Sequence, residues 1–221
     1  MRSPGQNKHQ RNSARTRDKL LAAAEELYGS RSIDAVSLRE ITARAGQKNP
    51  NALQYHFKDR DGLLQAIIDR HSTRVAEYRQ AYFQRAAQGE WQGAEAAARC
   101  LVMPIIEYVQ HSPEAVNFVR IVSQVRALNL ASDSGRDHGL RFPAVPGLKT
   151  LFDSALAELP PREAQRRVYL VVNTTFHGIA DIYRQPKDGL NPVLNARGPM
   201  AEQLVGLVQA GLAAPSRESR P

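Results

Sequence analysis

Hydrogen-bonding side chains are concentrated in one short segment, residues 51–57, whose sequence is Asn-Ala-Leu-Gln-Tyr-His-Phe. On a helix Leu53 and Phe57 would share one face, because residues four apart are neighbours, and both would turn toward a core. The other face would then present Asn51, Gln54, Tyr55 and His56. Asn and Gln can each form two hydrogen bonds with an adenine edge, and Tyr can contact a phosphate or a thymine methyl group. The segment therefore favours contact with DNA bases, although a plain solvated helix face would have the same composition.

Two helices joined by a tight turn are expected to position this segment. Ser37 and Glu40 fit the capping box, in which each side chain accepts a hydrogen bond from the other residue's backbone N–H. A short helix would start there and end at Gly46. Asn49 can cap a following helix that has Pro50 at its first position, where the missing N–H costs nothing. Two such helices form a helix-turn-helix, a unit that lays its second helix in the major groove of DNA.

The positive charge of the chain is concentrated at its N-terminal end. The 221 residues include 30 Lys and Arg against 22 Asp and Glu, a formal net charge of +8. Residues 1–17 hold five basic side chains and no acidic one, and residues 1–70 hold 13 basic against eight acidic ones. Such an excess suggests a polyanion as the partner of that end, either nucleic acid or an anionic membrane. Residues 1–12 alone could equally form a disordered, solvated tail.

The whole chain is predicted to be helical. Apolar residues recur at helical spacing, and Gly, Pro, Ser and Asp mark the ends of the segments. Expected helices span residues 14–28, 37–46, 51–57, 62–88, 92–110, 115–130, 148–159, 161–183 and 199–212, with a kink at Pro104 and a mobile loop at 131–147. The run Val168–Phe176 is rich in β-branched residues typical of a strand, but its neighbours keep the helical spacing. The fold class is therefore all-α, with about nine helices.

Residues 15–71 resemble the DNA-binding domain of TetR-family transcriptional regulators. Three blocks carry the resemblance, Arg17–Tyr28 (RDKLLAAAEELY), Ser37–Gly46 (SLREITARAG) and Leu53–Leu64 (LQYHFKDRDGLL). Between Gly46 and Leu53 the chain has six residues, one more than most members of the family. The resemblance implies a three-helix domain followed by a larger helical domain for ligand binding and dimerisation.

The resemblance also implies which side chains would touch DNA. Base-reading or groove-lining positions correspond to Ala52, Gln54 and Tyr55. Phosphate contacts correspond to His56, Lys58 and Arg60 after the recognition helix, to Ser37 before it, and to Arg15 and Arg17 in the first helix. The longer turn adds Lys48, Asn49 and Asn51 as candidate contacts. Phosphate contacts would supply affinity, and base contacts would supply discrimination.

Residues 75–221 resemble the family only in the number and length of their helices. The types of their side chains therefore suggest which residues could line a ligand site. Asn173 and His177 lie four residues apart on an apolar helix, which suits a pocket, a satisfied core pair or an interface alike. Arg120, Gln124 and Arg126 could meet an acidic ligand, although Arg126 also suits a solvated face. The candidate ligand-binding residues are Tyr108, Phe118, Arg120, Gln124, Asn173, Phe176 and His177.

The expected organisation is a flexible basic arm at 1–13, a helix-turn-helix domain at 14–71, a ligand-binding and dimerisation domain at 72–214 and a flexible tail at 215–221. The resemblance implies a homodimer through residues 162–184 and 199–212. The small and apolar spacing of the last helix suits close packing, at Leu204, Leu207, Val208 and Gly211. Two recognition helices about 34–36 Å apart would read a palindromic operator.

Other classes of protein lack their motifs. The chain has no nucleophile elbow, no phosphate-binding Gly loop and no zinc-type His pair, so we expect neither an enzyme nor a bound metal or cofactor. Asp133, Ser134 and His138 are too close in sequence for a catalytic triad. The single Cys100 excludes an internal disulfide framework and is interpreted as a buried small apolar residue. No apolar run is long enough for a membrane span, and the N-terminus lacks the apolar core of a signal peptide, which together suggest the cytoplasm.

The sequence thus predicts a DNA-binding transcriptional regulator, in the simplest case a homodimeric repressor that responds to an unidentified small molecule. The alternatives are an activator of the same fold and a DNA-binding protein that is ligand-independent or non-specific.

Overall fold

The computed structural model describes residues 4–131, 140–184, 193 and 196–216, with the backbone alone for 4–9 and 127–131. In this part of the chain all regular elements are helices, as predicted. The α-helices are α1 (Pro4–Ser30), α2 (Leu38–Arg44), α3 (Ala52–Phe57), α4 (Arg60–Ala87), α5 (Gly93–His111), α6 (Val116–Ala131), α7 (Pro146–Ala155), α8 (Pro161–Ile182) and α9 (Arg197–Ala213). Two short 3₁₀ helices are η1 (Ile33–Ala35) and η2 (Pro113–Ala115). Most of the expected loop at 131–147, including Asp133, Ser134 and His138, lies outside the described residues.

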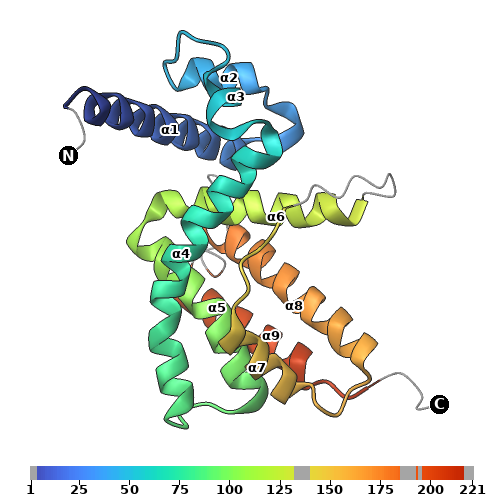
Figure 1. Ribbon diagram of the computed structural model, residues 1–221. Coiled ribbons are helices and arrows are strands. Elements are labelled where there is room, and N and C mark those ends of the chain that lie inside the picture. Colours follow the sequence, from blue (N-terminus) through green and yellow to red (C-terminus); the bar gives the residue numbers. More distant parts are fainter. Residues whose placement is uncertain (1–3, 132–139, 185–192, 194–195, 217–221) are drawn as a thin grey trace.

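Figure 1 shows α1, α2 and α3 grouped at one end of the molecule, with α4 descending from this group to the opposite end. Helix α6 lies across the molecule beneath the group, and α5, α7, α8 and α9 form the lower part. Helix α5 is central to that part, since it packs against α4, α7 and α9. The apolar core continues from the upper group, at Leu20 and Ile41, into the lower part, at Ile105 and Val122. Helices α4 and α6 therefore join the two parts.

The first helix is longer than predicted. It was expected to begin at Ala14 after a flexible arm, but α1 begins at Pro4. Proline is tolerated in the first turn of a helix, and the polar residues that follow contain no further proline. Adding residues to an existing helix costs far less than starting one, so the stable segment around Leu20 extends toward the N-terminus.

The side-chain caps predicted at the starts of α2 and α4 are confirmed. The cap of α2 has only one of the two hydrogen bonds of a capping box. The Oγ atom of Ser37 accepts a hydrogen bond from the backbone N–H of Glu40 at 3.1 Å. The reciprocal half of the capping box is absent, because the Glu40 carboxylate pairs with Arg31. At the start of α4 the Asp59 carboxylate accepts from the N–H of Gly62 at 2.8 Å.

The turn before α3 is built differently from the prediction. Asn49 does not cap the helix, since α3 begins at Ala52 and Pro50 precedes it. The Asn49 carboxamide oxygen instead accepts from the backbone N–H of Asn51 at 2.9 Å. This is the local turn that Asn side chains favour, and α3 starts one residue later than the expected helix 51–57.

The lower helices follow the predicted pattern with shifted ends. Helix α7 begins at Pro146 and ends at Ala155, earlier at both ends than the expected 148–159. The β-branched run Val168–Phe176 is helical, as the spacing of its neighbours indicated. Two residues of the predicted tail are held on α8, because Arg167 donates to the carbonyl of Pro215 and Ser216 donates to Glu163.

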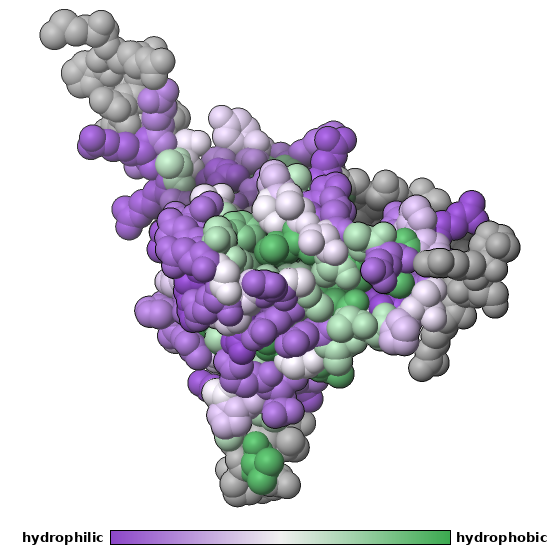
Figure 2. Space-filling model, turned by 90° about the horizontal axis from the view of Figure 1, so that it is seen from below, coloured by the Kyte–Doolittle hydropathy of each residue, from purple (hydrophilic) through white to green (hydrophobic). Residues whose placement is uncertain are grey.

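The surface of the lower part is mostly polar. Figure 2 views the molecule from below, away from α1–α3, and shows apolar residues gathered in the middle of this face with polar ones around them. None of the described helices is long and apolar enough to cross a membrane.

Candidate nucleic-acid interface and ligand cavity

Helix α3 separates its polar and apolar residues as the sequence predicted. Leu53 and Phe57 are buried in the core, whereas Gln54 is exposed and the Tyr55 side chain is 81% exposed. The Tyr55 ring is therefore accessible from solvent. Ala52 differs from the prediction, because it is buried against the core and cannot line a groove.

The polar face of α3 lies beside a groove shared with α1 and α4. Arg17 from α1 stands over the Phe57 ring, with its guanidinium carbon 4.9 Å from the ring centroid. Arg17, Tyr55, His56 and Lys58 line the groove together with Arg70 from α4. Burial, and secondly the charge of Arg17, lowers the pKa of His56 below its ordinary value.

The turn from α3 to α4 holds the groove in shape. Lys58 has a left-handed backbone, with φ of 70°, and its N–H donates to the carbonyl of Gln54 at 2.9 Å. Gly62 is required here, because a Cβ at this position would stand 2.0 Å from the carbonyl oxygen of Phe57. The Lys58 side chain is exposed at the edge of the groove.

Arg60, predicted as a phosphate contact, is partly exposed and is engaged by other groups of the protein. Its side chain turns toward η1, where it forms an ion pair with Asp34 at 3.4 Å and donates to the carbonyl of Val36 at 3.0 Å. The guanidinium satisfies a backbone carbonyl near the start of α2. Arg60 therefore fastens α4 to the turn that precedes the helix-turn-helix.

The other predicted contacts lie at the surface of the upper group. The exposed residues are Arg15, Ser37, Lys48, Asn49 and Asn51. Arg17, Gln54, Tyr55 and Lys58 are exposed as well. Polar and basic side chains from α1, the 46–52 turn and α3 are therefore accessible from solvent. In the structure Ala52 is buried, His56 and Arg60 are partly exposed, and the other predicted DNA contacts are exposed.

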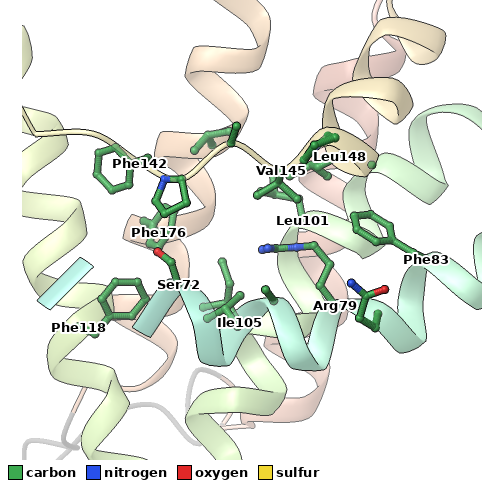
Figure 3. Close-up of a pocket in the computed structure, with 18 of the residues that line it drawn as sticks. Ser72, Arg79, Phe83, Leu101, Ile105, Phe118, Phe142, Val145, Leu148 and Phe176 are labelled. Atoms are coloured by element: carbon green, nitrogen blue, oxygen red, sulfur yellow. The ribbon is translucent and has the colours of Figure 1, made fainter. Parts of the chain in front are cut away.

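A cavity of about 460 Å³ lies in the lower part, between α4, α5, α6, α7, α8 and the segment before α7. Figure 3 shows Phe118, Phe142 and Phe176 gathered at one end of it and Phe83 and Leu148 at the other. This volume is within the ordinary range of small-molecule sites. Of the predicted ligand-binding residues, Phe118 and Phe176 line the cavity.

The remaining predicted ligand residues lie elsewhere, each for an identifiable reason. Tyr108 is buried and hydrogen-bonded to His71 at 2.7 Å. Arg120 donates to the carbonyl of Tyr183 at 3.3 Å. Asn173 accepts a hydrogen bond from Arg126, and its helical neighbour His177 is exposed on the outer face of α8. Hydrogen-bond capacity alone did not distinguish a cavity wall from a helix contact.

Arg79 lines the cavity and was missed by the sequence reasoning. It continues the buried stripe of α4 between Val75 and Tyr82, at spacings of four and three residues. An arginine within an apolar stripe is a detectable signal, because a charge is rarely placed in a core without a purpose. Arg126 also lines the cavity, between the rings of Phe142 and Tyr169.

Gln124 connects the two parts of the molecule. Its carboxamide oxygen accepts from the N–H of Ile33 at 2.9 Å, and its nitrogen donates to the carbonyl of Tyr28 at 2.9 Å. Helix α6 also approaches α1 very closely, since a Cβ on Gly29 would stand 2.4 Å from the Asn117 side chain. The end of α1 is therefore fixed directly on α6, the helix that brings Phe118 to the cavity.

A second contact crosses the same junction through a buried histidine. The His71 ring stacks on Phe118 at 4.7 Å, and its Nε2 atom lies 3.3 Å from a carboxylate oxygen of Glu25 on α1. One face of Phe118 thus touches the cavity while the ring packs on a residue that faces α1. A shift of Phe118 would therefore displace His71 and disturb its contact with Glu25 on α1.

Large apolar side chains are exposed on one face of α8 and α9. Leu170 on α8 and Leu207 on α9 are each 61% exposed. They line a groove between these helices together with His177 and Met200. Gly178 lets the helices approach, because a Cβ there would stand 2.8 Å from Leu204.

Comparison with known proteins supports the upper group as a recognised domain. Residues 20–67 match the family model of bacterial regulatory proteins of the tetR family. A solved structure of a TetR-family regulator from Streptomyces coelicolor A3 is similar over 97% of this chain and 99% of that chain, with 19% sequence identity and a TM-score of 0.46. No curated protein matches the chain.

Proposed function

We propose, from the premise that residues 20–67 form the DNA-binding domain of a TetR-family transcriptional regulator, that the protein is a ligand-responsive repressor. It would bind a palindromic operator as a homodimer and release it when a small molecule enters the cavity. The DNA partner agrees with the cytoplasmic location expected from the sequence.

The observation that carries the proposal is the free polar face of α3. Tyr55 and Gln54 project from a helix whose other side is fully used by the core, and Arg17 and Lys58 flank them. A helix can present three or four side chains to base edges when its neighbours hold the phosphates. This arrangement supports reading of sequence rather than attraction to charge alone.

The proposed homodimer rests on the exposed leucines of α8 and α9. A helix contributes only a few base contacts, so one copy would discriminate poorly and two would read both halves of a palindrome. Leu170 and Leu207 are apolar side chains without cover in the described part of one copy. Packing of α8 and α9 against the same helices of a second copy would remove both from water, and the patch would be self-complementary as a two-fold interface requires.

The proposed response to a ligand runs through α6. Phe118 lines the cavity, and Gln124, less than two turns further along the helix, holds the end of α1. A ligand that prefers one position of α6 would shift the population of the upper group by its difference in affinity between the two states. Operator affinity would fall by the same factor.

The first experiment is selection of random DNA duplexes by the purified protein, sequenced at two salt concentrations. A palindromic consensus that persists at the higher salt would support the dimeric repressor. Recovered duplexes without a consensus, together with a steep loss of binding on adding salt, would contradict it and leave a non-specific DNA-binding protein.

A further inference from the structure

We propose that the cavity binds a monocarboxylate with an apolar body, and that the guanidinium of Arg79 is the partner of its carboxylate. This inference rests on the proposed function for the role of the ligand, but not for its chemistry. The chemistry follows from the side chains that line the cavity.

Arg79 is held by one edge only. In α5, Pro104 has no N–H to donate to the carbonyl of Cys100, four residues before it. The Nε atom of Arg79 donates to this carbonyl at 3.0 Å and so replaces the missing helix hydrogen bond. This contact fixes the side chain while leaving the Nη side of the guanidinium for another partner. Figure 3 shows Arg79 extending from α4 into the cavity, with Leu101, Ile105 and Val145 around it.

The charge of Arg79 has no counterion in the described part of the chain. The residue is only 6% exposed, and no carboxylate of that part lies within ion-pair distance. Burial lowers the pKa of Arg79 to about 10, which still leaves the group charged at neutral pH. An uncompensated buried cation is costly, and a buried anion next to it removes much of that cost.

The rest of the lining supports one anionic group on an apolar molecule. No Asp or Glu is among the described residues that line the cavity, and most of the wall is aliphatic or aromatic. The second cation, Arg126, already donates to Asn173 and lies between two aromatic rings. One free guanidinium edge matches the two oxygens of one carboxylate. The phenylalanine end of the cavity would hold the apolar body.

The experiment uses two acids and their neutral isosteres with the full-length protein. Decanoate and decanamide form the first pair, and 2-naphthoate and 2-naphthamide form the second. Isothermal titration calorimetry would measure the four dissociation constants. We expect at least one acid to bind at least about tenfold more tightly than its amide, because the amide leaves Arg79 unpaired. Equal binding of acid and amide in both pairs, or no binding of either acid, would overturn the proposal.

Two variants identify the guanidinium responsible. Arg79→Met should weaken binding of the acid by about 30-fold or more, while binding of the amide changes little. Arg126→Met should keep the preference for the acid, and loss of the preference in this variant alone would refute the assignment to Arg79. Circular dichroism checks that Arg79→Met is folded. If it is not, Arg79→Lys serves instead and should retain part of the preference, because the charge remains without the fork.

The same samples separate this proposal from the proposed function. Operator binding is measured with and without the tighter acid. Binding of the acid with no effect on the operator would leave the ligand chemistry standing and contradict the ligand-responsive repressor. Operator binding with no acid bound would contradict the ligand chemistry and leave DNA recognition intact.

Discussion

Tyr55 is the side chain on which sequence reading by a single residue can be tested. It is the most exposed large aromatic group of α3, and its removal leaves Leu53 and Phe57 in the core. Tyr55→Ala should therefore cost about 1–3 kcal/mol of operator binding with little change on random DNA. Fluorescence anisotropy with the selected operator and a scrambled duplex measures both. Equal losses on the two duplexes would remove Tyr55 from base readout.

Arg17 and Arg60 are both arginines near α3, but their side chains contact different groups. Arg17→Ala should weaken binding to all DNA and reduce the salt slope by about one unit, because one phosphate contact is lost. Arg60→Gln should leave the slope unchanged and lower the free energy of unfolding by about 1 kcal/mol, through the lost hydrogen bond to the Val36 carbonyl. Salt titration of binding and chemical denaturation of both variants provide the test. A reduced slope in Arg60→Gln would restore it as a phosphate contact.

Among the elements, α6 joins the two parts of the molecule through the side chain of Gln124. Gln124→Met removes the side-chain hydrogen bonds to Tyr28, Arg31 and Ile33, so amide exchange across residues 28–36 should become faster. Exchange in α9 should not change, because that helix lies in the other part. Hydrogen–deuterium exchange with mass spectrometry measures both segments. Gln84→Met, at an exposed position of α4, is the matched control. Unchanged protection of 28–36 would show that the junction is held by packing alone.

The elements were predictable from the sequence where one local rule decides them. Ser37 and Asp59 start their helices because a side-chain oxygen caps the first turn, and this rule needs no tertiary information. The start of α1 was missed because the polar segment after Pro4 has weak preferences of its own. Glu40 satisfied its capping rule only in part, since Arg31, nine residues before it, offered a competing charge.

The exposed side of α3 could be predicted from the sequence, whereas the cavity could not. The exposed side of α3 follows from helix periodicity around Leu53 and Phe57. The cavity depends on which helices meet, and five helices with the segment before α7 contribute its wall. Arg79 and Phe83 come from α4, which the sequence indicated only as a long helix after Asp59. Gln124 has the chemistry of a ligand contact and serves a junction instead.

For the whole molecule, assembly is the property that the exposed leucines decide. Leu207→Asp places a charge in the proposed interface, so sedimentation at micromolar concentration should change from dimer to monomer. The variant should remain folded, because Leu207 lies outside the core of one copy. Ala81→Asp, on exposed α4, is the control and should remain dimeric. An unchanged mass for Leu207→Asp would place the interface elsewhere, and a monomeric wild type would contradict the dimer altogether.

The length of α4 has a mechanical consequence. The helix carries Arg79 at the cavity and Arg60 beside the recognition helix, and at 1.5 Å per residue these positions are about 28 Å apart. A rigid rod pivoting at the cavity end by about five degrees would carry its far end through about 2.5 Å, judged from that length. In a symmetric pair the two rods would swing oppositely, and the separation of the recognition helices would change by up to about twice that amount. If the protein is the proposed ligand-responsive dimer, α4 would act as a lever arm beside the path through α6, and a small rotation around a bound molecule would change the fit of two helices in successive grooves.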